Sequence, residues 1–258
     1  MKVVLLAGGL GTRISEETDK KPKPMIEIGG KPILWHIMKL YSHYGFNDFI
    51  VCAGYKPYCI KDYFYHYFMH SADMTIDMQQ NKITYHHSHA EPWQVTVVDT
   101  GLNTMTGGRI KRVQKYVGNG RFMATYGDGL SSQNLHNLLA FHESHGKVGT
   151  MTTVQPSGRF GSVDIGEGNQ IKAFIEKPHA DGACINAGFF IFEPEIFDYI
   201  DGDEAILERG PLEGLTRDGQ LFAFKHDGFW KPMDTLREKY ELEEMWQSGK
   251  APWMVWND

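Results

Sequence analysis

Glycines and two basic side chains stand close together near the start of the sequence. The stretch Leu6–Pro24 contains A-G-G-L-G-T-R, and Lys23 follows Arg13 by ten residues, between two prolines. Successive glycines let backbone N–H groups approach a phosphate closely, and the guanidinium of Arg13 fits phosphate oxygens. The prolines favour an extended loop that aims Lys23 without a helix. The combination predicts a phosphate site.

The stretch fits neither of the two common glycine-rich phosphate motifs. A P-loop requires G-x-x-x-x-G-K-[ST], but Gly30-Lys31 is followed by Pro32 and preceded by Met25 at the first glycine position. A dinucleotide-binding turn requires G-x-G-x-x-G, but Ile14 occupies its last position. The alternative to a phosphate site is a tight turn between a strand and a helix, followed by a solvated basic loop.

Two aspartates are candidate ligands for a divalent cation that would accompany such phosphates. Asp128 stands between glycines directly after an apolar segment, and Asp234 follows the segment W-K-P-M. Mg²⁺ in proteins takes one or two carboxylates and completes its shell with phosphate and water oxygens. Each aspartate has an alternative role as an ordinary turn residue, and the sequence does not show whether the two meet.

The elements that must position these residues begin with a strand–helix–strand unit. The apolar run Lys2–Ala7 predicts a buried parallel strand. Residues 32–44 have helical spacing, with a proline in the first turn, and residues 48–53 predict a second strand. This order predicts a right-handed crossover in a parallel sheet.

The rest of the chain continues with the same two kinds of element. We expect helices over 61–70, 135–145 and 236–246 and from 193 onward, strands over 95–99, 121–126, 148–154 and 186–192, and a hairpin of 161–165 with 171–175. The predicted fold class is α/β, with a Rossmann-like, mostly parallel sheet flanked by helices and an antiparallel β insert in the second half.

Composition limits the classes of partner. The chain has 258 residues, 41% of them hydrophobic, and a net charge of −6, which argues against a nucleic-acid partner. No apolar run approaches the roughly 20 residues of a membrane helix, so we expect no membrane association. The 3 cysteines lack metal-type spacing, which favours reduced thiols and a cytoplasmic location.

The motif A-G-G-x-G-T-R followed by K-P-K-P resembles the signature of sugar-1-phosphate nucleotidylyltransferases, and the resemblance extends from Met1 to about Tyr240. It implies a fold of the nucleotide-diphospho-sugar transferase type and one domain over residues 1–258. Residues 1–155 would form the nucleotide-binding part, and residues 156–258 the part for sugar phosphate and oligomerisation. It also implies a homo-oligomer, with a hexamer as the form considered, and a role in making O-antigen sugars of lipopolysaccharide.

Three later segments match the sugar side of this family. The segment I-E-K-P at 175–178 matches the E-K-P of the family, in which the lysine contacts the sugar phosphate and the glutamate contacts a sugar hydroxyl. The segments R-F-G-S-V at 159–163 and N-A-G at 186–188 match family segments that lie beside the sugar. A surface ion pair is the alternative for the glutamate and lysine. The implied sugar-phosphate-binding residues are Tyr126, Gly161, Glu176, Lys177, Asn186 and Trp230.

The segment expected to contact the base departs from the relatives that use dTTP. Those carry G-L-A-Q-A, whereas Gly101-Leu102 here are followed by a segment that ends in T-G-G-R at Arg109. The resemblance therefore implies CTP as the nucleotide and glucose 1-phosphate as the sugar substrate. One alternative is the same transfer with dTTP, UTP or ATP, or with another hexose 1-phosphate. The other is a regulatory subunit that binds these ligands without turnover. The implied nucleotide-binding residues are Leu6, Ala7, Gly8, Gly9, Leu10, Gly11, Thr12, Arg13, Lys23, Thr104, Gly108, Arg109 and Asp128.

The expected reaction is in-line attack of the sugar phosphate on the α-phosphorus, with release of pyrophosphate. Arg13 and Lys23 are the expected catalytic residues: Arg13 stabilises the pyrophosphate and Lys23 holds the α-phosphate. The expected metal is Mg²⁺ on Asp128 and Asp234. No general base is assigned, because the second pKa of a phosphate monoester is about 6.

Overall fold

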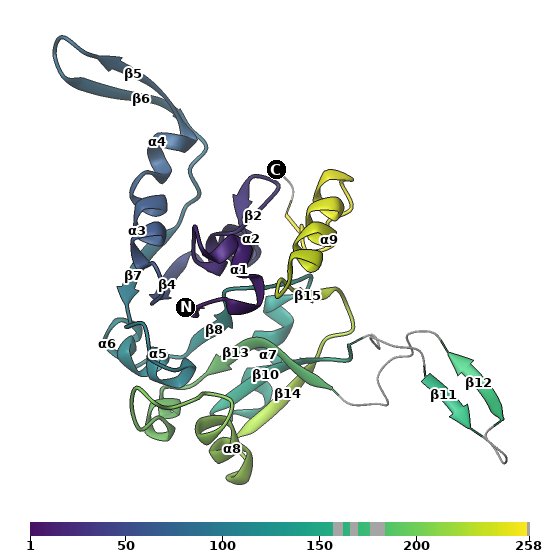
Figure 1. Ribbon diagram of the computed structural model, residues 1–258. Helices are drawn as coiled ribbons and strands as arrows, with labels where there is room; N and C mark the ends of the chain where they lie inside the picture. The colour runs from purple at the N-terminus through teal and green to yellow at the C-terminus, as the bar shows by residue number, and fades with distance from the viewer. Residues whose placement is uncertain (157–161, 166–169, 176–183, 257–258) are drawn as a thin grey trace.

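A seven-stranded sheet organises the computed structural model, which describes residues 1–156, 162–165, 170–175 and 184–256 (Figure 1). Its strands lie in the order β14 (Leu221–Lys225), β10 (Gly149–Val154), β13 (Ile185–Phe192), β8 (Phe122–Tyr126), β1 (Lys2–Ala7), β4 (Asp48–Ala53) and β7 (Gln94–Asp99). Only β13 runs antiparallel to its two neighbours within this sheet. The expected α/β class with a mostly parallel sheet is confirmed.

Helices cover both faces of the sheet, so β1 is apolar throughout. Val3, Leu5 and Ala7 pack into one hydrophobic core, whereas Val4 and Leu6 pack into a second core on the other face. The first core includes residues of α2 (Ile33–His43), α7 (Leu135–His145) and α9 (Leu236–Gln247). The second includes residues of α5 (Thr106–Arg112), α6 (Gln114–Val117), η4 (Pro194–Tyr199) and α8 (Gly210–Arg217).

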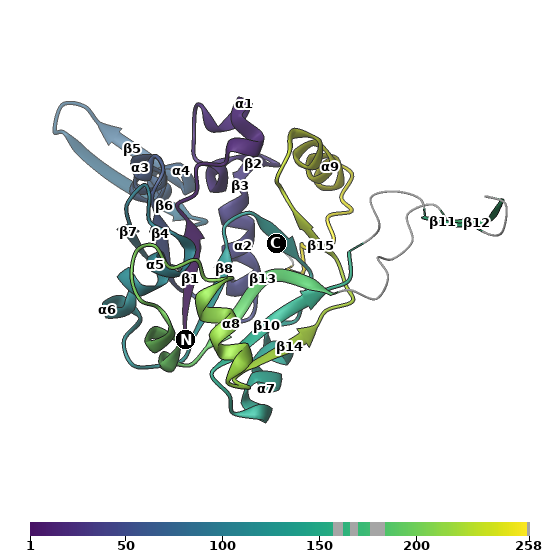
Figure 2. The same ribbon diagram turned by 60° about the horizontal axis from the view of Figure 1, so that its bottom comes forward.

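Shorter elements lie outside the main sheet. Four two-stranded sheets pair β2 (Glu27–Ile28) with β3 (Lys31–Pro32), β5 (Ala72–Asp77) with β6 (Lys82–Ser88), β9 (Gly129–Ser131) with β15 (Trp230–Pro232), and β11 (Ser162–Ile165) with β12 (Ile171–Ile175). The remaining helices and helical turns of the described residues are η1 (Thr12–Ile14), α1 (Ser15–Thr18), η2 (Lys23–Met25), α3 (Pro57–Tyr65) and α4 (Tyr67–Ser71). The β5–β6 hairpin, which the sequence did not predict, extends away from the sheet in both views (Figure 2).

The structure corrects three sequence expectations in detail. The helix expected over 61–70 is two helices, because the backbone of His66, between α3 and α4, departs from helical geometry (φ −93°, ψ 1°). The helix expected from residue 193 is the 3₁₀ turn η4. The loop expected to be extended around Lys23 is extended at Pro22 (ψ 150°) and at Ile26 (ψ 134°), but Lys23 opens the 3₁₀ turn η2 between them.

Chain topology brings several segments to one edge of the sheet. The chain crosses from β1 through α2 to β4 on one side, whereas β8 lies on the other side of β1. The carboxyl ends of β1 and β8 therefore flank a topological switch point, where α/β sheets bind ligands. Because β13 runs in the opposite direction, its first residues, Ile185–Ala187, reach this same edge.

In the part of the chain that is described, none of the helices combines the length and the apolar character needed to span a bilayer.

His36, on α2, is a fully buried ionisable group in the first core. Its Nε2 lies 2.8 Å from the carbonyl oxygen of Ile28, and the indole Nε1–H of Trp253 points to Nδ1 at 3.4 Å. Nε2 must therefore carry the hydrogen and Nδ1 must accept, which is the neutral form. Burial lowers the pKa of His36 to about 4; the hydrogen bond to Ile28 and the charge of Glu243 oppose this shift, and the charge of Lys31 adds to it.

We predict that His36 makes the protein less stable in mild acid. Its pKa is lower in the folded than in the unfolded chain, so the unfolded state binds the extra proton and stability falls as the pH drops below about 6.5. Between pH 7 and pH 5 the loss from this group is about 2 kcal/mol. Urea unfolding at the two pH values should show this loss in the wild type and a smaller one in His36→Gln. The exposed His87→Gln is the control, and equal losses in all three proteins would contradict the prediction.

Candidate active site

A cavity of about 980 Å³ opens at the edge of the sheet where β1 and β8 end. Its lining comes from the segments 6–13 and 23–24, 102–106 with Arg109, 125–129, 186–187, and from Glu204, Glu208, Trp230, Pro232 and Asp234. Residues from both ends of the chain thus share one cavity, of a size suited to a small-molecule ligand.

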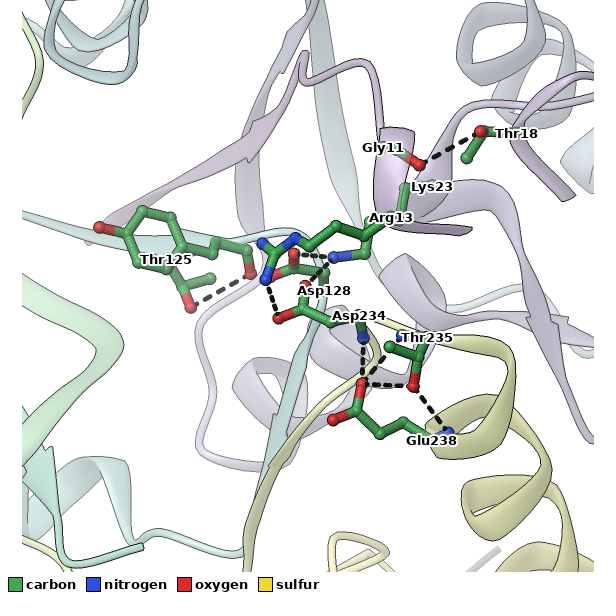
Figure 3. Close-up of polar contacts among 10 residues, drawn as sticks. Gly11, Arg13, Thr18, Lys23, Thr125, Asp128, Asp234, Thr235 and Glu238 are labelled. Carbon is green, nitrogen blue, oxygen red and sulfur yellow. Dashed lines mark hydrogen bonds and ion pairs between the residues drawn. The ribbon is translucent and has the colours of Figure 1, made fainter. Parts of the chain in front are cut away.

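An ion cluster joins three distant parts of the chain in this cavity (Figure 3). The Nζ atom of Lys23 lies 2.5 Å from Oδ2 of Asp128 and 2.6 Å from Oδ1 of Asp234. Nη1 of Arg13 lies 2.6 Å from the other oxygen of Asp234. The Lys23 side chain is 10% exposed and that of Arg13 is 72% exposed, so only the lysine is held inside the protein.

Short backbone pairings bring the two aspartates together. Asp128 directly precedes β9, and Gly129 pairs with Pro232 in the β9–β15 ladder. The N–H of Met233 then donates to the Asp128 carbonyl at 2.8 Å. On the other side, Glu238, which forms the capping box of α9 with Thr235, also accepts from the Asp234 N–H at 2.7 Å. Asp234 is therefore fixed between a strand and a helix N-terminus.

Arg109 supports the glycine-rich turn from within the protein. Its guanidinium is almost fully buried and donates to five acceptors: the carbonyl oxygens of Gly8, Ala53, Gly101 and Leu102 and the hydroxyl of Thr100, at 2.7–3.3 Å. Burial lowers its pKa, but an arginine remains charged near neutral pH. Arg109 thus ties the turn after β1 to the segment predicted to contact the base.

The glycines of this turn serve two physical purposes. A Cβ atom on Gly8 would lie 2.1 Å from Nη1 of Arg109, so Gly8 leaves space for the guanidinium. Gly11 has a φ of +67°, in the left-handed region that favours glycine, and a Cβ there would meet Thr18 at 2.7 Å. A Cβ on Gly9 would meet no heavy atom within 4 Å.

Another part of the cavity wall carries a chain of hydrogen bonds. The Tyr126 hydroxyl donates to Glu208 and accepts from Nδ2 of Asn186 at 3.3 Å, and Oδ1 of Asn186 accepts from the Gly188 N–H at 2.7 Å. Burial, and then the Glu208 carboxylate, raises the pKa of Tyr126, so the phenol stays protonated. The indole N–H of Trp230 donates to the Ala187 carbonyl at 2.8 Å.

The structure brings most of the predicted site residues to the cavity. Those that line it are Leu6, Ala7, Gly8, Gly9, Leu10, Gly11, Thr12, Arg13, Lys23, Thr104, Arg109, Tyr126, Asp128, Asn186, Trp230 and Asp234. Gly108 does not line it; a Cβ there would lie 2.5 Å from the carbonyl oxygen of Asp203, so this glycine permits close packing. Gly161, Glu176 and Lys177 lie outside the described residues.

Sequence reasoning missed two carboxylates of the cavity wall. Glu204 and Glu208 line the cavity from the segment between η4 and α8. Neither residue lies in a helix or strand, so no periodic pattern marked the segment, and no catalytic motif contains them. Their position follows from hydrogen bonds of α5 to this segment, such as the Gly108 N–H to the Ala205 carbonyl at 3.1 Å.

The ion cluster is suited to bringing polyanions together. Two cations beside a glycine-rich turn can bind phosphate oxygens. Both aspartates reach one nitrogen atom, so they lie close enough to share one small cation. Among the described residues no group of three or more histidine, cysteine, aspartate or glutamate side chains could hold a metal ion. A divalent cation held here would therefore take its other ligands from phosphate and water, which fits Mg²⁺.

Comparison with known proteins extends over nearly the whole chain. A family model described as "Nucleotidyl transferase" matches residues 2–229. "Glucose-1-phosphate cytidylyltransferase" of Salmonella typhimurium is 56% identical over 257 residues, which are 99% of this chain and 100% of that protein. A Bacillus subtilis protein named "Probable glucose-1-phosphate cytidylyltransferase" is 42% identical over the same shares of both chains. The crystal structure of HddC from Yersinia pseudotuberculosis has a TM-score of 0.69 at 24% identity, covers 95% of this chain and 99% of its own, and has the same fold.

We predict that Gly8→Ala destabilises the protein through Arg109. The added methyl group displaces the guanidinium and leaves a buried charge without its acceptors, which should lower the free energy of unfolding by about 2–3 kcal/mol. Gly9→Ala is the matched control, because its methyl group meets open space and should change stability by less than about 0.5 kcal/mol. Urea unfolding measures both. Similar stabilities for the two variants would show that Arg109 does not depend on Gly8.

Proposed function

The chain belongs to the nucleotidyl transferase family, and we propose that it transfers the cytidylyl group of CTP to glucose 1-phosphate, giving CDP-glucose and pyrophosphate. The observation that carries this proposal is the convergence of Arg13, Lys23, Asp128 and Asp234 on one cavity. The likeness to the Salmonella enzyme over the full length of both chains supports the choice of nucleotide and sugar.

The task of such a site is to align two polyanions. The attacking oxygen belongs to a phosphate whose second pKa is about 6, so the nucleophile is already ionised near neutral pH. No side chain has to remove a proton from it. Alignment for in-line attack and compensation of negative charge are then the main contributions of the protein.

Lys23 and Arg13 lie in different surroundings, which suits them to different phosphate groups. Lys23 is held by two carboxylates deep in the cavity, which suits an ammonium that stays beside the α-phosphate. Arg13 is mostly exposed and makes one ion pair, so it can turn toward the leaving pyrophosphate. Backbone N–H groups of the turn after β1 add fixed dipoles for phosphate oxygens. Lys177, the predicted contact of the sugar phosphate, lies outside the described residues.

Asp128 and Asp234 would hold the divalent cation, and we propose that it is Mg²⁺. When bound, it supplies positive charge to the α-phosphate and the leaving pyrophosphate. Lys23 occupies the space between the two carboxylates in the structure, so the lysine and the cation compete for the same oxygens. Phosphate oxygens of the nucleotide offer Lys23 and Arg13 alternative partners, which frees the two aspartates.

The alternatives differ in substrate or in turnover. The same transfer to dTTP, UTP or ATP, or to another hexose 1-phosphate, would use the same ion cluster. A regulatory subunit without turnover is disfavoured, because such a protein has no need to keep both aspartates and both cations. We further propose that the protein forms a homo-oligomer, with the hexamer as the form to test. We also propose a cytoplasmic location and a role in O-antigen sugar synthesis. Within the chain, residues 1–155 would bind the nucleotide, and residues 156–258 would bind the sugar phosphate and form the oligomer.

Product formation tests the proposed function directly. The purified protein with Mg²⁺, CTP and glucose 1-phosphate should form CDP-glucose and pyrophosphate, measured by anion-exchange chromatography. In parallel reactions with dTTP, UTP or ATP, kcat/KM should be lower by at least about tenfold. A base other than cytosine would leave polar groups of the base-binding segment without partners, which weakens transition-state binding by about 1.4 kcal/mol or more. A folded protein that makes no product from any of these pairs would overturn the proposal.

Metal binding tests the competition between Lys23 and a divalent cation. Lys23→Met removes the ammonium from between two carboxylates, so it should tighten Mn²⁺ binding to the nucleotide-free protein by at least about tenfold. The loss of free Mn²⁺ signal in electron paramagnetic resonance measures this. The same variant should lose product formation by about 10²-fold or more. Lys21→Met, which removes a lysine paired with Glu27 in the same loop, is the matched control. Equal Mn²⁺ affinity in all three proteins would contradict the competition.

A further inference from the structure

Glu208 joins two separate segments of the cavity wall by hydrogen bonds. One carboxylate oxygen accepts from the Tyr126 hydroxyl, and the other accepts from the Thr106 hydroxyl at 2.8 Å. Thr106 opens α5 within the segment predicted to contact the base, whereas Tyr126 ends β8 beside Asn186. Oγ1 of Thr106 also accepts from the Leu207 N–H at 2.9 Å, which leaves its hydrogen for Glu208.

The carboxylate determines the direction of the hydrogen bonds beyond it. An ionised carboxylate only accepts, so the Tyr126 hydroxyl must donate to it and offers a lone pair to Nδ2 of Asn186. Oδ1 of Asn186 accepts from the Gly188 N–H, so the side-chain amide is held in one orientation. Asn186 lines the cavity and keeps a second N–H that can donate to a ligand hydroxyl.

The position of Glu208 in the cavity wall has to be explained, because its negative charge repels the phosphate groups of the substrates. A carboxylate on the wall of a cavity that receives two polyanions raises the cost of binding them. Glu208 forms no ion pair among the described residues that would offset this charge; its partners are two hydroxyl groups. The role of Glu208 therefore lies in the two hydroxyl groups, of Thr106 and Tyr126, from which its oxygens accept hydrogen bonds.

We infer that Glu208 is a positioning residue for the sugar: through Tyr126 it holds the Asn186 amide in the orientation that donates to a hydroxyl of the hexose. The inference rests on the proposed function, since it takes the Asn186 end of the cavity as the sugar side. It predicts that removal of the Glu208 carboxylate weakens binding of the sugar and leaves nucleotide binding unchanged. A residue that only stabilised the fold would affect both ligands.

Steady-state kinetics of a small set of variants tests the inference. Glu208→Ala should raise the KM for glucose 1-phosphate about tenfold and change the KM for CTP by less than about twofold, since one oriented hydrogen bond is lost. Glu208→Gln should stay within about threefold of the wild type, because its amide oxygen can still accept from Tyr126 and its NH₂ can donate to Thr106. Tyr126→Phe should match Glu208→Ala, and the double variant should be no worse than either single variant.

Ligand binding separates this inference from the proposed function. Calorimetric titration should give Glu208→Ala an affinity for CDP-glucose about tenfold below that of the wild type, with an unchanged affinity for CDP, which lacks the hexose. Glu213→Ala, an exposed glutamate of α8, is the control for loss of a carboxylate. Equal losses for CDP and CDP-glucose, no loss for either, or Glu208→Gln as impaired as Glu208→Ala would overturn the inference. A wild type that binds CDP-glucose but makes none would count against the proposed function alone.

Discussion

The site depends on one ammonium group held between two carboxylates. Lys23 lies near the start of the chain, Asp128 near its middle and Asp234 near its end, yet all three meet within hydrogen-bond distance. A charge this little exposed is stable only if it is paired. The pairing therefore requires that the turn after β1, the end of β8 and the approach to α9 keep their relative positions. The same pairing holds Lys23 at the cavity before any ligand binds.

The reversed strand β13 gives this site its second half. In a purely parallel sheet the edge beyond β1 and β8 would receive only the carboxyl ends of strands. Because β13 runs antiparallel between β8 and β10, the start of the strand, with Asn186 and Ala187, lies beside Tyr126. The indole N–H of Trp230 donates to the Ala187 carbonyl at this point. One change of strand direction thus adds Asn186 and Ala187 to the lining of the cavity that holds the ion cluster.

The sequence predicts the parts of this site that obey local rules. Continuous apolar residues predict β1, and glycines followed by Arg13 predict the phosphate-binding turn at its end, because strand burial and close backbone approach are properties of neighbouring residues. The meeting of Asp128 with Asp234 depends on β9 and β15, which are too short to leave a pattern. Glu208 has no such pattern either, and only the tertiary contacts of α5 bring its segment to the cavity.

Gly8 shows why a motif can be recognised correctly and still be understood incompletely. From the sequence, the lack of a side chain at Gly8 is expected to let a phosphate approach the backbone. In the structure the space behind Gly8 is filled by the guanidinium of Arg109, which binds the Gly8 carbonyl from inside the protein. The hydrogen-bond acceptors of this guanidinium are neutral, so none of them cancels its charge. The glycine therefore lets the protein place a positive charge against the turn, at the cavity that Gly8 and Arg109 both line.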